Sequence, residues 1–386
     1  MLLEYIRRFF MAALLLLSLA VRAQSVTFPE ATVGAIQGSG GAGGLGGATY
    51  TVPIQVPEGL GGIQPSLAVA YNSQGGNGLL GWCWDLQGLS SVTRAGTTLY
   101  HDGAVSGVDF DDDRFMLDGQ RLICVSGTYG ANNAEYRTEM DGMAKIVSYT
   151  CDTTYGPAYF KVWLPNGNIA YYGNSADSRI GLQRHNDVCL WLLNRMEDRN
   201  GNYMEYHYVR RGASYRIDRI NYGGNAVAEI PCCYSVRFHY SERDDKELSF
   251  IGDNTLDQKQ ILDSIRVMRG YNVLNRYWFE YHAPSLSNGY YYSRLDRINF
   301  SRGEESFSPT VIQWGTNDYG SYGSSQCHSI SVTGGSASDF EGKIKFTGDL
   351  NGDGYTDVIV YYPDMDNDKS DVKAAVFYIT ASRPLV

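Results

Sequence analysis

The chain has 386 residues, enough for two or three domains, and 43% of them are apolar, enough for a sizeable core. Lys and Arg total 32 against 42 Asp and Glu, and the resulting charge of −10 excludes a protein that binds nucleic acid through a basic surface. With 44 Gly, 30 Tyr and only 19% charged residues, the composition favours aromatic-rich β-sheet and excludes helical bundles and coiled coils.

The first predicted element is an export signal at residues 1–23. An apolar run from Phe9 to Val21 follows two arginines and ends at the small-residue site Val21-Arg22-Ala23, as is typical of a cleaved secretory signal peptide. The run is shorter than the roughly 20 apolar residues of a membrane span, so we expect no stable span after cleavage. The protein is therefore predicted to be secreted or held at the cell surface. An uncleaved membrane anchor at the same residues is the alternative.

Residues 24–48 are predicted to form a Gly-rich lead-in. Seven of the ten residues from Gly38 to Gly47 are glycine, and such a segment lacks the side chains that build a core. Its Gly-x-Gly-x-x-Gly spacing has no strand before it and no helix after it, so a dinucleotide site is rejected in favour of a flexible or tightly turning segment. From residue 49 onward, short alternating runs such as 49–56 and 66–72 predict β-strands.

Local signals within this β-rich region predict individual turns and faces. The Asn-Gly pairs at 166–167 and 200–201 lie between strand-like runs and predict hairpins. Trp82 and Trp84 would share one face of a strand at period two, which favours an aromatic core plug beneath a tight turn over a sugar-stacking platform. The segment 187–196 is the single candidate helix.

One loop near the end of the chain carries metal-binding chemistry. Asp349, Asn351 and Asp353 present oxygens at alternate positions, and Gly354 permits the sharp turn that folds a loop around a hard cation. The loop lacks the glutamate at the twelfth position and the following helix of an EF-hand. Instead Asp357 closes it at the ninth position, and apolar residues typical of a strand follow. The sequence therefore predicts a strand-loop-strand Ca²⁺ site.

Two other acidic clusters and the cysteines are assigned no chemistry. Residues 364–371 repeat the acidic spacing without the glycine and are predicted to be a solvated loop, and residues 109–113 are predicted to be an exposed turn before a hairpin at 115–123. Seven cysteines in scattered positions predict no disulfide framework. The chain has no Gly-x-Ser-x-Gly, Gly-Lys-Ser/Thr or His-Glu-x-x-His motif, so no catalytic residue is assigned.

A linked set of motifs resembles a known family. Residues 52–59, 61–67, 71–73 and 78–82 closely resemble the amino-terminal domain of the Salmonella virulence plasmid B protein (SpvB) and of the B components of Tc insecticidal toxins. The block Asp113 to Leu122 looks like the same family, and Asp-Arg-Asn-Gly-Asn-Tyr at 198–203 is similar to YD and Rhs sequences. Together these segments cover residues 49 to about 315. The acidic loop resembles the FG-GAP or integrin-type repeat of β-propellers, which implies the carbonyl of Tyr355 as a further ligand.

The resemblance implies an all-β, mostly antiparallel protein. We expect a β-sandwich or shell-like SpvB-like domain at 49–330, followed at 331–386 by a partial β-propeller blade of the FG-GAP/VCBS type. The domain would be non-catalytic, because the ADP-ribosyltransferase motifs of SpvB are absent from this sequence.

One blade cannot bury its own faces, so we expect the propeller to continue in a missing carboxy-terminal part or in toxin-complex or Rhs-like subunits. The expected function is that of an exported structural module of a toxin-shell or toxin-delivery protein, which could serve virulence or competition between bacteria. The alternative is a secreted Ca²⁺-dependent adhesin that binds glycans or proteins through exposed aromatic residues.

Overall fold

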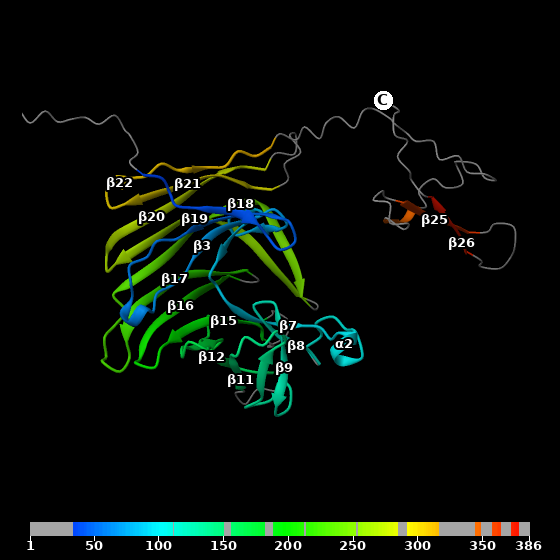
Figure 1. Ribbon diagram of the computed structural model, residues 1–386, viewed down its shortest axis with the longest axis horizontal. Coiled ribbons are helices and arrows are strands. Elements are labelled where there is room, and N and C mark those ends of the chain that lie inside the picture. Colours follow the sequence, from blue (N-terminus) through cyan, green and yellow to red (C-terminus); the bar gives the residue numbers. More distant parts are fainter. Residues whose placement is uncertain are drawn as a thin grey trace, which may run out of the picture. The chain divides into compact units, whose positions relative to one another are not determined.

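The fold is described from a computed structural model (Figure 1), which describes residues 34–110, 112–149, 156–181, 188–211, 214–251, 254–284, 292–315, 344–348, 357–363 and 372–377. Contacts divide the chain into two units, Met1–Gly315 and Thr316–Val386. The predicted signal peptide and the predicted domain boundary at 330 lie outside the described residues. Within those residues the helical elements are η1 (Leu60–Gly62) and α2 (Leu99–Asp102), and almost everything else regular is antiparallel strand, as predicted.

The first unit begins with a four-stranded sheet in the order β1 (Ser39–Ala42), β2 (Ala48–Pro53), β3 (Ala68–Asn72) and β6 (Trp84–Gln87). The two strands predicted at 49–56 and 66–72 are thus confirmed as β2 and β3. The Gly-rich segment turns tightly, with the amide of Gly43 donating to the carbonyl of Gly47 at 2.7 Å. Its first half is nevertheless a strand, because β1 pairs with β2 and supplies the edge of this sheet.

Nine further strands surround another part of the same hydrophobic core. They are β7 (Ser91–Ala95), β8 (Arg114–Leu117), β9 (Gln120–Ser126), β10 (Glu135–Thr138), β11 (Lys145–Tyr149), β12 (Tyr159–Trp163), β13 (Ile169–Tyr172), β14 (Arg179–Gly181) and β15 (Val188–Glu197). The ladder closes on itself because β15 pairs with both β13 and β7. Phe115, Phe160 and Trp191 meet edge to face inside it, with ring centroids 5.2–5.4 Å apart.

The prediction of a helix at 187–196 is wrong, because this segment forms the strand β15. Five consecutive residues, Cys189 to Leu193, are buried, since β15 is covered on both faces. A strand buried on both faces loses the alternation that identifies strands in a sequence, so its short apolar run resembles a buried helix.

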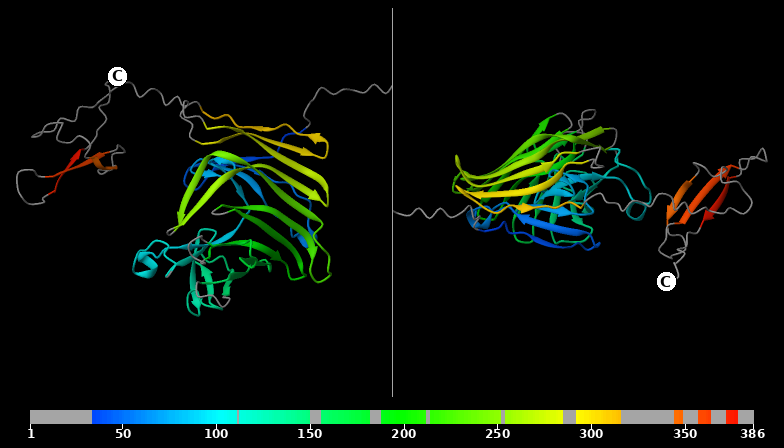
Figure 2. Two further views of the ribbon diagram at one scale, coloured as in Figure 1. Left: turned by 180° about the vertical axis from the view of Figure 1, so that it is seen from behind. Right: turned by 90° about the horizontal axis from the view of Figure 1, so that it is seen from above.

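From β15 onward long strands form a broad curved sheet (Figures 1 and 2). Its members are β16 (Asn202–Arg211), β17 (Ser214–Asn225), β18 (Tyr234–Ile251), β19 (Asn254–Arg269), β20 (Asn272–His282) and β21 (Arg294–Arg302), with the short β22 (Glu305–Ser306) and β23 (Thr310–Val311) at its end. The predicted Asn-Gly hairpins are confirmed, since Gly167 and Gly201 adopt φ of 88° and 81° at the β12–β13 and β15–β16 turns.

The second unit contains β24 (Ile344–Gly348), β25 (Asp357–Pro363) and β26 (Val372–Phe377) in one antiparallel sheet. The strand predicted after the acidic loop is confirmed as β25. The register places Gly348 opposite Asp357, so the loop 349–356 leaves and re-enters the sheet at one position. The proposed ligands Asp349, Asn351, Asp353 and Tyr355 lie outside the described residues.

Candidate functional site

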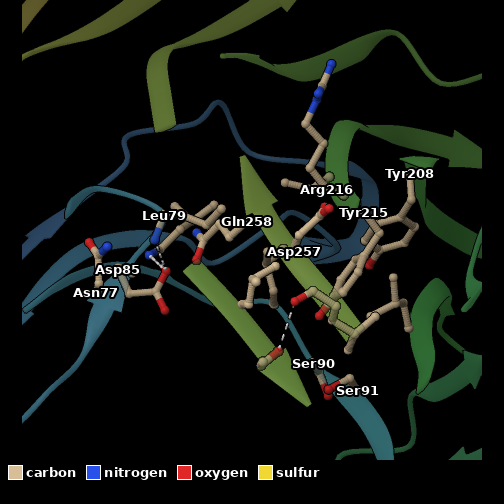
Figure 3. Close-up of a pocket in the computed structure, with 18 residues that line it drawn as sticks. Asn77, Leu79, Asp85, Ser90, Ser91, Tyr208, Tyr215, Arg216, Asp257 and Gln258 are labelled. Carbon is tan, nitrogen blue, oxygen red and sulfur yellow. Dashed lines mark hydrogen bonds between the residues drawn. The ribbon is translucent and has the colours of Figure 1, made fainter. Parts of the chain in front are cut away.

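One cavity in the described part of the chain lies where two strands separate. Along β15, residues 195–197 pair with β16, whereas residues 190–192 pair with β7 on the same edge. As β16 and β7 diverge they leave a pocket of about 550 Å³ (Figure 3), a volume typical of small-ligand sites. Its lining comes from eight strands, including β4 (Asn77–Gly78), and from the loops beside β4 and β7.

Side chains satisfy the backbone groups that the separation of the strands leaves unpaired. The hydroxyl of Tyr208 donates to the carbonyl of Leu193 at 2.7 Å, and the amide of Tyr208 donates to the Asp177 carboxylate at 3.0 Å. Burial raises the pKa of Tyr208 well above its ordinary value, so the hydroxyl remains a donor. The place where β16 and β7 separate, called the fork below, is therefore a hydrogen-bonded feature of the fold and not an irregular gap.

Two carboxylates line this pocket from different elements. Asp85 of β6 accepts the amides of Leu86 at 2.8 Å and Leu79 at 3.3 Å through Oδ1. Asp85 is exposed, yet the protein atoms packed around its carboxyl partly desolvate it and raise the pKa of Asp85 in spite of both hydrogen bonds. Asp257 of β19 pairs through Oδ2 with Lys259 at 2.5 Å, while its Oδ1 is buried and has no hydrogen-bond partner.

Leucine side chains and separate polar groups line the pocket. Figure 3 shows the guanidinium of Arg216 extending away from the other labelled side chains, and it lies over the Tyr240 ring at 4.9 Å. No described cluster of His, Cys, Asp or Glu is arranged to hold a metal ion. Leucine walls with separate carboxylates suit a ligand that carries donors or positive charge on an apolar body. Sequence analysis missed this site because its residues come from strands far apart in the chain.

A buried charged cluster anchors one wall of the pocket. Arg243 and Asp245 pair at 2.9 Å with side chains that are 0% and 1% exposed. They occupy a bulge in β18, where residues 243–246 fall between the pairs Glu242–Gln260 and Glu247–Gln258. Asp245 also accepts the amide and hydroxyl of Ser293 and the side-chain amide of Asn77. This cluster fixes the end of the β18–β19 hairpin to β4.

The two tryptophans near this cluster do not share a face, which corrects the sequence prediction. Cys83 between them has a φ of 62°, which interrupts the strand and breaks its alternation between β5 (Gly81–Trp82) and β6. Trp84 is buried, as the predicted core plug requires, whereas Trp82 is 37% exposed. The ring of Trp82 stacks on Tyr292 with centroids 4.6 Å apart and planes 5° apart.

The acidic cluster at 109–113 is exposed at Asp109 and Asp112, as predicted, but its last residue is not. Asp113 is buried and accepts from Arg94 at 3.2 Å, and the same carboxylate accepts the amides of Asp109 and Phe110. The Arg94 guanidinium is packed among the rings of Phe110, Phe115 and Trp191. Asp112 does remain exposed. The cluster is thus a turn that folds back over a buried ion pair.

Comparison with known families supports the predicted resemblance over part of the chain. Residues 42–222 match the family described as Salmonella virulence plasmid 65kDa B protein. No curated protein sequence matches the chain. No helix in the described residues has the length and apolar character needed to cross a membrane.

Solved structures share the fold at low sequence identity. The TcdB2-TccC3 crystal structure matches 89% of this chain and 20% of its own, with a TM-score of 0.64 and 14% identity. The Photorhabdus luminescens Tc holotoxin pore matches 73% of this chain and 16% of its own, with a TM-score of 0.59 and 14% identity. The amino-terminal domain of SpvB from Salmonella typhimurium strain LT2 matches 66% of this chain and 99% of its own, with a TM-score of 0.55 and 15% identity.

The chain therefore spans about a fifth of the TcdB2-TccC3 chain that it resembles.

Proposed function

We propose that this chain is an exported, non-enzymatic structural module of a toxin-complex-like assembly. The main support is the structural similarity to TcdB2-TccC3 over 89% of this chain, together with the family match at residues 42–222. The arrangement of charge supports the proposal. The buried charges form two ion pairs, Arg94–Asp113 and Arg243–Asp245, which link segments of the fold and are not gathered around a reactive group. Partners would be toxin-complex or Rhs-like subunits that supply the remainder of a shell.

The partner prediction is tested by tagging the full chain in its own organism and crosslinking before purification. Mass spectrometry is expected to identify a Rhs-like or toxin-complex polypeptide crosslinked to the first unit. A chain that remains monomeric and uncrosslinked in its own host, yet binds immobilised glycans in a Ca²⁺-dependent way, would instead establish the adhesin function.

We further propose that the loop 349–357 binds Ca²⁺ through Asp349, Asn351, Asp353, the carbonyl of Tyr355 and Asp357. The oxygen-only donor set suits a hard cation. The pairing of Gly348 with Asp357 supports the proposal, because it closes the backbone on both sides of the loop. Ca²⁺ bound there would join the loop to β24 and β25 and serve a structural role.

Calorimetric titration of the full chain tests the Ca²⁺ site. We expect binding with a Kd on the order of 10⁻⁴ M or tighter, and no measurable binding after Asp353→Ala with Asp357→Ala, because two of the charged ligands are lost. The matched control is Asp364→Ala with Asp366→Ala in the neighbouring acidic loop, which removes the same charge and should bind as the wild type does. Equal binding by both double variants would refute this assignment.

A further inference from the structure

Four arginines lie directly opposite one another on four adjacent strands of the broad sheet. Arg219 of β17 pairs in register with Arg237 of β18, Arg237 pairs with Arg266 of β19, and Arg266 pairs with Arg276 of β20. Neighbouring strands lie roughly 4.8 Å apart, so this arginine ladder extends over about 15 Å. The ladder cannot be recognised in the sequence, because the four arginines become neighbours only through strand pairing.

The ladder faces away from the core. The residues next to it in the chain, including Ile220, Val236, Val267 and Tyr277, are buried, and alternate residues of a strand point to opposite faces. Arg237 and Arg276 are exposed, while Arg219 and Arg266 are half-buried. The guanidinium groups are therefore presented together on one surface of the sheet.

The charges of the ladder are poorly compensated within the described part of the chain. Arg219 pairs with Asp218 at 2.9 Å, but Arg237, Arg266 and Arg276 form no ion pair with any described carboxylate. The Nε of Arg266 is buried without a hydrogen-bond partner. Like charges directly opposite in a sheet are destabilising, and an unpaired buried donor adds a further cost. A hydrogen-bond acceptor from outside the sheet, such as a carboxylate, would reduce both costs.

The surface around the ladder has the character of a protein interface. The Arg276 guanidinium lies 5.3 Å from the ring centre of the half-buried Trp278 in the next outward position of β20. Arg and Trp are the residue types most enriched among those that dominate binding energy. The planar fork of Arg matches carboxylates two hydrogen bonds at a time, which favours Arg over Lys at such surfaces.

We propose that the arginine ladder binds an acidic segment of a partner polypeptide. Carboxylates on successive turns of an α-helix lie about 5.4 Å apart along its axis, close to the spacing of the strands that carry the arginines. The net charge of −10 would repel a long polyanion such as DNA, whereas a short acidic segment meets only the local positive charge. This inference is independent of the proposed toxin-complex function.

Fluorescence anisotropy with a labelled poly-L-glutamate peptide at low salt tests the ladder. The full chain should bind the peptide, and Arg237→Gln with Arg266→Gln should weaken binding about tenfold or more. The control Arg137→Gln with Arg199→Gln removes the same charge elsewhere on the first unit and should leave binding unchanged.

Thermal unfolding of the same proteins separates loss of binding from loss of folding. Because the ladder variant relieves repulsion between opposed charges, its unfolding temperature should equal or exceed that of the wild type. Equal peptide binding by all three proteins would overturn the proposal. Displacement of the peptide by heparin or DNA at lower concentrations than by unlabelled poly-L-glutamate would overturn the polypeptide assignment.

Discussion

Replacing Asp245 by alanine is expected to lower the free energy of unfolding by about 3–5 kcal/mol, because it leaves the buried Arg243 guanidinium without its counter-charge. The loss extends beyond that pair. Asp245 also accepts from Ser293 and Asn77, so three segments far apart in sequence lose a common acceptor. Urea-induced unfolding followed by tryptophan fluorescence measures the change.

Asp244→Ala is the matched control, because Asp244 is the adjacent residue, carries the same charge and is exposed. Its free energy of unfolding should stay within about 0.5 kcal/mol of the wild type, as expected for surface changes. Similar losses in the two variants would show that the bulge tolerates an unpaired Arg243, and the anchoring role of the cluster would be wrong.

The same cluster makes the free energy of unfolding depend on pH. Burial alone would raise the pKa of Asp245, but the hydrogen bonds from Arg243 and Ser293 outweigh burial and hold this pKa well below its ordinary value. A carboxyl with a lowered folded pKa stabilises the fold fully above its unfolded pKa of about 3.9 and loses that contribution as the pH falls toward the folded value. The stability difference between wild type and Asp245→Ala should therefore shrink as the pH is lowered below about 4.

Local patterns in the sequence predicted the elements that local physics determines. The Asn-Gly turns form as predicted because each requires a positive φ at glycine. Likewise β16 buries Tyr206 and Tyr208 while Glu205 and His207 face outward, because alternate residues of a strand point to opposite faces. The family resemblance likewise depended on short motifs within 52–82. These predictions needed no knowledge of which strands pair.

The sequence could not predict features that depend on tertiary pairing. Trp82 and Trp84 lie on different faces because Cys83 adopts a left-handed backbone conformation, which cysteine rarely does and which the sequence therefore does not predict. The pocket at the fork combines Asp85 with Asp257 across strands that only the register brings together. The arginine ladder has the same origin, since successive members are 10 to 29 positions apart along the chain.

The last prediction concerns the block Asp113 to Leu122, which resembles the toxin family in sequence. Asp113→Ala should lower the free energy of unfolding by about 3–5 kcal/mol, because Arg94 then remains charged among Phe110, Phe115 and Trp191. The exposed neighbour Asp112 is the control, and Asp112→Ala should cost no more than about 1 kcal/mol. Urea unfolding of the full chain provides both values.

A double variant shows whether the charge pair itself stabilises the fold. Arg94→Met with Asp113→Leu removes both charges and should be more stable than Asp113→Ala alone, since a buried pair replaced by apolar groups avoids the isolated charge. Recovery should be incomplete, because the amides of Asp109 and Phe110 lose their acceptor. If the double variant were no more stable than Asp113→Ala, the turn would depend on those two amides and not on the ion pair. In either case the first residue of the family-like block acts by holding a turn over the aromatic core, which is the role expected of a structural module.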